Sequence, residues 1–100
     1  MDGVYETNIN TPMGKINIRL ALKQSGNILN GMIEIMGNKY PLSPGMINNN
    51  RCYFKGNLQN KQNNNMSLKY ELNGELIENI LNIYARTNMG EFNIKANKIL

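Results

Sequence analysis

Apolar and polar residues alternate along much of this chain, a pattern typical of strands with one buried face. Within residues 15–23 every even position is apolar, from Ile16 to Leu22, and most odd positions are polar. The same alternation recurs in residues 28–36, 51–58 and 66–72. We therefore expect antiparallel strands over these ranges, each with one face against a core and the other against water.

Turn signals separate the expected strands. Three are pairs containing glycine, which tolerates the positive φ of tight turns: Ser25-Gly26, Gly37-Asn38 and Pro44-Gly45. Asn73-Gly74 is the strongest hairpin signal, because both residues accept positive φ, so we expect a hairpin there. Residues 39–42 predict only a short edge strand, because Pro41 cannot donate a hydrogen bond to a neighbouring strand.

Residues 76–86 fit two interpretations. Their apolar positions also match one face of a helix: Leu76, Ile77, Ile80, Leu81 and Tyr84. We favour a strand with a bulge near Glu78-Asn79, because the expected Asn73-Gly74 turn leads directly into it. Residues 91–100 alternate again and predict the last strand.

A short internal similarity supports this layout. Residues 11–18 (TPMGKINI) align with residues 87–94 (TNMGEFNI), agreeing at Thr, Met, Gly, Asn and Ile. Two similar turns near the two ends of the chain suit a meander that closes on itself. We predict an all-β, single-domain protein over residues 1–100: an antiparallel up-and-down meander of about eight short strands forming a small barrel or strongly curled sheet.

Two features near the ends of this meander resemble a motif of a known family of β-barrels. Gly3-Val4-Tyr5 opens the first expected strand, and Arg86 lies late in the chain. This arrangement resembles the Gly-x-Trp and closing Arg of the calycins, the lipocalin-like and avidin-like barrels, with Tyr in place of Trp. The resemblance implies that Tyr5 plugs one end of the barrel and that Arg86 packs over it. It concerns the fold and implies no substrate.

Composition excludes several kinds of chemistry. The chain has no His and one Cys, so imidazole bases, Ser-His-Asp triads, His-ligated metals and paired-Cys zinc sites are excluded, and we expect neither a metal nor a cofactor. The net charge is +4, but the basic residues are dispersed among acidic ones, so nucleic acid is not the expected partner. The N-terminus resembles no secretory signal, and no apolar run exceeds three residues. We expect a cytoplasmic protein without a membrane span.

The favoured hypothesis is a non-catalytic barrel module that binds a small apolar ligand or a protein partner, as a homo-oligomer. An eight-stranded barrel is either filled by its own side chains or holds one small ligand. The expected apolar lining consists of Ile18, Leu20, Ile33, Phe54, Leu68 and Ile83, and the polar residues expected to orient a ligand are Asn82, Tyr84 and Arg86. Methionines at corners and outward positions predict a subunit interface or a pocket rim: Met13, Met32, Met36, Met46 and Met89.

An enzyme is the first alternative. Glu78 stands between Ile77 and Ile80, where burial would raise its pKa toward neutrality and make it a general base. The reaction would be a cofactor-independent isomerisation, cyclisation or hydration, with Tyr84 or Arg86 stabilising negative charge. A bulge that points Glu78 into solvent would remove this possibility.

Single-stranded nucleic-acid binding is the second alternative. Arg51, Tyr53 and Lys55 share the outward face of one strand, and a basic and aromatic face can stack bases and neutralise phosphates. Cys52 lies on the opposite face, where we expect a small buried hydrophobic residue. Glu34 and Glu71 occupy outward positions, where we expect them to pair with Lys or Arg on adjacent strands.

Overall fold

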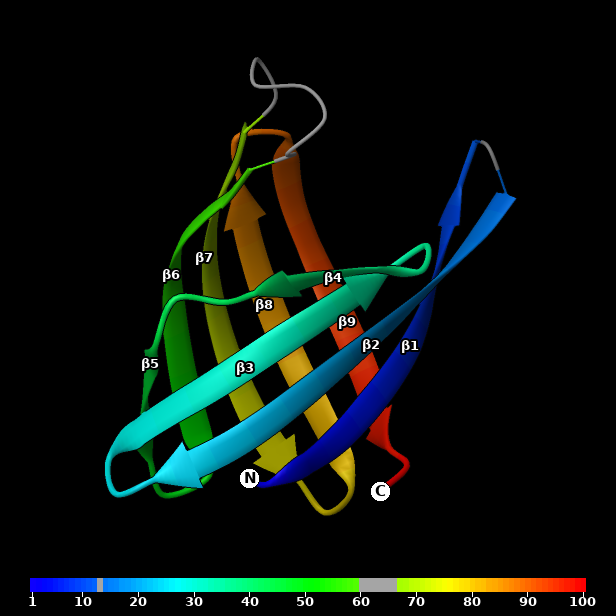
Figure 1. Cartoon of the computed structure of the whole chain (residues 1–100). Coiled ribbons are helices and arrows are strands. Elements are labelled where there is room, and N and C mark those ends of the chain that lie inside the picture. The colour runs from blue at the N-terminus through cyan, green and yellow to red at the C-terminus, as the bar shows by residue number, and fades with distance from the viewer. Residues whose placement is uncertain (13, 60–66) are drawn as a thin grey trace.

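The computed structural model of the chain describes residues 1–12, 14–59 and 67–100, without the side chains of Thr11, Leu58, Gln59, Ser67 and Leu68. These residues form nine strands and no helix (Figure 1). The strands are β1 (Gly3–Thr11), β2 (Gly14–Ser25), β3 (Ile28–Ile35), β4 (Asn38–Pro41), β5 (Gly45–Asn48), β6 (Arg51–Gln59), β7 (Ser67–Ile77), β8 (Ile80–Thr87) and β9 (Gly90–Lys98).

The strands occupy eight positions around a closed antiparallel barrel. Each strand pairs with the next in sequence from β1 to β3 and from β5 to β9, and β9 pairs with β1. One position is divided between β4 and β5, because β4 pairs with residues 32–35 of β3 and β5 with residues 28–29. In the break between them, the Leu42 amide donates to the Gly31 carbonyl at 2.9 Å. The predicted all-β up-and-down barrel is confirmed, as is the short strand near Pro41.

The core is formed by the inward residues of the alternating strands. In β2 the buried residues are Leu20 and Leu22, and in β6 they are Cys52 and Phe54, whereas Tyr53 between them faces outward. The other buried core residues are Tyr5, Leu29, Leu42, Ile47, Tyr70, Leu81 and Ala96. β2 and β3 cross in front of β7, β8 and β9 at a steep angle, so the two sides of the barrel pack face to face around this core (Figure 1).

The barrel closes through a short contact between its first and last strands. β1 pairs with β9 only at Tyr5 and Glu6, opposite Lys98 and Asn97. Beyond this contact the β1–β2 hairpin diverges from β9 (Figure 1). Inward side chains of the upper part of β9 therefore lack the cover that a fully paired β1 would give them.

The hairpin expected at Asn73-Gly74 is absent. β7 continues through both residues, and they pair with Tyr53 and Cys52 of β6. Gly74 is buried, and a Cβ atom there would stand 2.7 Å from Cys52 Sγ. This glycine therefore permits close approach of two strands. The local turn preference of Asn-Gly is outweighed by the nine residue pairs that join β6 to β7.

The turn lies instead at Glu78-Asn79, between the paired residues Ile77 and Ile80. The predicted strand with a bulge at Glu78-Asn79 is therefore wrong, because these residues form a turn between two strands. The helical interpretation of residues 76–86 is also excluded. Glu78 has a φ of 58°, a left-handed conformation that is unusual for a residue with a side chain. The turn reverses the chain and sends β8 back along β7.

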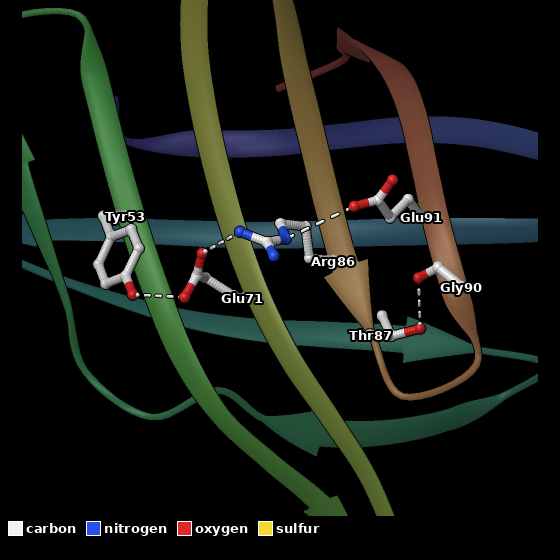
Figure 2. Close-up of polar contacts among 6 residues, drawn as sticks. All are labelled: Tyr53, Glu71, Arg86, Thr87, Gly90 and Glu91. Carbon is white, nitrogen blue, oxygen red and sulfur yellow. Dashed lines mark hydrogen bonds and ion pairs between the residues drawn. The ribbon is translucent and has the colours of Figure 1, made fainter.

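The two similar sequence segments near the chain ends both contain hairpin turns at the same end of the barrel. Gly14 and Gly90 follow them with φ values of 113° and 128°. In the second turn, the Thr87 hydroxyl donates to the Gly90 carbonyl at 2.9 Å (Figure 2). The same hydroxyl accepts a hydrogen bond from the Met89 amide at 3.0 Å. Met13, in the first turn, lies outside the described residues.

Candidate functional site

The residues expected to contact a ligand lie on two different faces of the sheet. Leu20 and Phe54 are buried on the inner face, and Ile18, Ile33 and Ile83 are half-buried there. Leu68 lies in β7, but its side chain is outside the described part of the chain. The polar residues face the other way: Asn82, Tyr84 and Arg86 alternate with the inward residues of β8. One ligand inside the barrel therefore cannot contact both groups.

Exposure of the inner face increases along the barrel. Near the two termini its apolar side chains are fully buried, with Tyr5, Leu29 and Leu81 at 0% exposure. Toward the opposite end Tyr70 and Ala85 stay buried, whereas the inward residues of β2, β3 and β9 become half-buried and Phe92 of β9 is 44% exposed. We refer to this open part as the inner apolar surface, formed by Ile18, Ile33, Ile83, Phe92 and Ile94. It lies where β1 diverges from β9.

The outer face of β6, β7, β8 and β9 carries three ordered cross-strand rows. The middle row consists of Tyr53, Asn73, Tyr84 and Asn93. The row on one side consists of Arg51, Glu75, Asn82 and Lys95, and the row on the other side of Lys55, Glu71, Arg86 and Glu91. We refer to these three rows as the outer face. Two tyrosines thus lie between two rows rich in charge.

Arg86 connects the two tyrosines through two carboxylates. The Tyr53 hydroxyl donates to Glu71 Oε2 at 3.0 Å, and Glu71 Oε1 lies 3.8 Å from Arg86 Nη1 (Figure 2). On the other side Arg86 Nε lies 3.6 Å from Glu91 Oε1, and the Glu91 carboxylate is close enough to the Tyr84 hydroxyl to raise its pKa. We refer to this chain of contacts as the tyrosine bridge. It confirms the expected pairing of Glu71 with a basic residue.

The tyrosine bridge changes the acidity of both phenols. Partial burial and the hydrogen bond to Glu71 raise the pKa of Tyr53. The nearby Glu91 carboxylate, followed by partial burial, raises the pKa of Tyr84. The Arg86 charge opposes both shifts. Both hydroxyls therefore remain protonated at neutral pH, and that of Tyr53 donates to Glu71.

Two grooves cross the outer face. The first, of about 510 Å³, runs between the Arg51 row and the tyrosine row, and its outward side chains are Arg51, Asn73, Glu75, Asn82, Tyr84, Asn93 and Lys95. The second, of about 540 Å³, lies beyond the tyrosine bridge and is lined by Lys55, Asn57, Lys69, Glu71, Arg86 and Asn88, with the backbone of β6, β7 and β8 beneath. Both grooves offer hydrogen-bond donors and acceptors together.

Glu78 lies in an exposed hairpin turn and does not point into the barrel. The geometry that the enzyme alternative requires, a carboxylate inside a cavity, is therefore not present at this residue. Cys52 is buried as expected, and desolvation raises the pKa of its thiol despite a hydrogen bond from the Gly74 backbone. A thiol held in its neutral form is a poor nucleophile.

The resemblance to calycins extends to Tyr5 but not to Arg86. Tyr5 is fully buried at the end that holds both termini, and its hydroxyl donates to the Met1 carbonyl at 3.0 Å. Arg86 is exposed on the outer face, opposite Glu91 of β9, whereas Tyr5 is opposite Lys98. Seven residues of β9 separate the two positions, or about 23 Å along the strand. Arg86 therefore does not pack over Tyr5.

The described methionines expected at corners or outward positions are all exposed. Met36 and Met89 are 74% and 73% exposed in turns at the open end of the barrel. Met32 and Met46 lie on the outward side of β3 and β5, and Met46 is the direct neighbour of Ile28. These side chains form an apolar rim at one end and an apolar strip along one side.

The described residues contain no cluster of three or more His, Cys, Asp or Glu side chains suited to hold a metal ion. In the same part of the chain, no helix has the length and apolar character needed to cross a membrane. Comparison of the sequence with protein-family models and curated proteins, and of the structure with solved structures, finds no match.

Proposed function

We propose that this protein is a non-catalytic binding module that holds a small apolar molecule on the inner apolar surface. The observation that carries the proposal is the incomplete burial of Ile18, Ile33 and Ile83 and the exposure of Phe92 on the face that forms the core elsewhere. A filled barrel would bury all of its inward side chains. Exposed inward hydrophobic residues are a surface that an apolar ligand can cover.

Burial of apolar surface can stabilise a small ligand at this site. Removing 100 Å² of apolar surface from water contributes about 2.5 kcal/mol. The inner apolar surface ends at the buried side chains of Leu20, Leu81 and Tyr5, which close the barrel beneath it. The exposed Met36 and Met89 stand at the open end and add adaptable apolar contacts. The calycin-like barrel, with one open and one closed end, is consistent with this mode of binding.

The test is a titration with an uncharged apolar fluorescent probe, N-phenyl-1-naphthylamine. We expect saturable binding that weakens about tenfold in Phe92→Ser, because the ring is exposed enough to be removed without unfolding the core. Ile77→Ser is the matched control, since Ile77 is 52% exposed at the end of β7 and lies outside the inner apolar surface. Absence of saturable binding, or equal effects of the two variants, would refute the proposal.

We also propose self-association through the apolar strip. Ile28 and Met46 are cross-strand neighbours, and Met46 is 68% exposed. Two such strips facing each other would bury apolar surface that a monomer leaves in water. Light scattering over a range of concentrations should show an oligomer that Met46→Glu dissociates. A wild-type protein that stays monomeric at every concentration would contradict this.

A further inference from the structure

We propose that the outer face binds an extended, uncharged oligosaccharide, with Tyr53 and Tyr84 packing against two of its sugar rings. This site is separate from the inner apolar surface, because the thickness of the sheet lies between them. The inference rests on the placement of the two phenol rings, on the polar groups around them and on the local balance of charge.

The two phenol rings lie on the same cross-strand row of the outer face. Tyr53 pairs with Asn73 and Asn73 with Tyr84, so the tyrosines are two strands apart, about 10 Å. They are 36% and 38% exposed, which leaves part of each ring accessible. A sugar ring has an apolar C–H side that packs on an aromatic ring. An extended chain crossing the strands can therefore place one sugar on each tyrosine.

The tyrosine bridge holds the rings before a ligand arrives. The hydroxyl of Tyr53 is hydrogen-bonded to Glu71, the Glu91 carboxylate lies near the hydroxyl of Tyr84, and Arg86 lies between these carboxylates. Side chains that are already ordered lose less conformational entropy on binding. Arg86, Glu71 and Glu91 are thus positioning residues for the two rings.

The first groove provides hydrogen-bonding side chains beside the row that contains Tyr53 and Tyr84. Asn73, Asn82 and Asn93 have amide groups that both donate and accept hydrogen bonds, and Glu75 accepts while Lys95 donates. Hydroxyl groups of a sugar also donate and accept. A groove with both kinds of group matches a polyhydroxylated chain better than it matches an apolar or a purely anionic one.

Although the outer face is positive overall, carboxylates stand beside both tyrosine rings. The outer face and the adjoining Lys69 carry five basic and three acidic side chains, a net charge of +2: Arg51, Lys55, Lys69, Arg86 and Lys95 against Glu71, Glu75 and Glu91. Glu71 is bonded directly to the Tyr53 hydroxyl, and the Glu91 carboxylate lies near that of Tyr84. A base stacked on either ring would bring its phosphate near that negative charge. We therefore favour an uncharged chain over single-stranded nucleic acid.

Calorimetric titration with cellohexaose, xylohexaose and mannohexaose tests the proposal. At least one of these should bind, and Tyr53→Ala and Tyr84→Ala should each weaken that binding about tenfold. Tyr84→Phe keeps the ring and should retain most of the affinity. Lys23→Ala, an exposed position on β2 outside every proposed binding surface, is the matched control, and circular dichroism verifies that each variant is folded.

Three outcomes would overturn the proposal. None of the three oligosaccharides binds; or one binds equally to wild type and both alanine variants; or the face binds a single-stranded oligonucleotide instead, with an affinity that falls steeply as salt increases. Retention of oligosaccharide binding in Phe92→Ser would show that the outer face acts independently of the inner apolar surface.

Discussion

Gly74 lies directly opposite Cys52 in the β6–β7 pair, and there is no room for a Cβ atom between its backbone and the Cys52 sulfur. Glycine in the middle of a strand costs about 0.5–1 kcal/mol relative to alanine. The chain retains glycine at this buried position because the thiol occupies the space that a side chain would need. The absence of a side chain at Gly74 therefore leaves the space that the Cys52 thiol fills.

Gly74→Ala should lower the free energy of unfolding by about 1–3 kcal/mol, because the added methyl group would overlap the Cys52 thiol. Denaturant unfolding measures this change. In a Cys52→Ala background the sulfur is absent, so the same substitution should cost less than half as much. Equal costs in both backgrounds would show that the thiol is not what excludes a side chain.

Stability should decrease as pH rises above about 9. Burial raises the pKa of Cys52, and burial with the nearby Cys52 and Asp2 raises the pKa of Tyr5. At alkaline pH the unfolded chain loses these protons while the folded chain keeps them, so the unfolded state binds fewer protons and the free energy of unfolding falls. Thermal unfolding from pH 7 to 11 should show the decrease. Its slope should be smaller in Cys52→Ala and in Tyr5→Phe, and an unchanged slope in both would contradict the assignment.

Arg86→Gln should make the tyrosines of the bridge harder to ionise. The Arg86 charge lowers the pKa of Tyr53 and Tyr84, whereas the carboxylates beside them raise it. Removing the cation should shift the phenolate absorbance titration of these residues to higher pH. Arg51→Gln is the control, because Arg51 pairs with Glu75 at 3.1 Å rather than with Glu71 or Glu91. The same titration curve in both variants would mean that the tyrosine bridge does not form.

Glu78→Gly should stabilise the protein by about 0.5–1 kcal/mol, because glycine adopts the left-handed φ of this turn without steric cost. The expected result is a midpoint of thermal unfolding several degrees higher. Glu75→Gly serves as the comparison, since Glu75 lies in β7 without a positive φ and should lose stability. A destabilised Glu78→Gly variant would indicate that the carboxylate makes a needed contact.

The alternation of side chains predicted which residues share a face, but not which residues are neighbours across the sheet. Phe54 and Cys52 are inward and Tyr53 is outward, as the pattern of β6 indicates. The same alternation in β8 places Ile83 on the inner face and Tyr84 and Arg86 on the outer face. The two polar residues expected to orient a ligand therefore could not lie beside Ile83 in the interior. Faces follow from a local period of two, which one sequence displays directly.

Register depends on interactions that are distant in the sequence. The Asn73-Gly74 pair has the local preference of a turn, yet β6 pairs with β7 through both residues. Once that register is known, Tyr53 and Tyr84, 31 residues apart, fall in one row. A sequence signal did exist, since alternation places Glu71 at an outward position, but its partner could be identified only from the pairing of β7 and β8.

The contact that closes the barrel joins segments from opposite ends of the chain. The Ile99 amide donates to the Val4 carbonyl at 2.8 Å, and the Val4 amide donates to the Leu100 carbonyl at 3.2 Å. During synthesis on the ribosome, β2 to β8 can pair in the order in which they emerge, because each adjoins a strand made shortly before it. β1, although made before the other eight described strands, has to wait for residues 97–100 before its second edge is paired. Chaperones that shield exposed strand edges would therefore have their longest opportunity to act on the first strand.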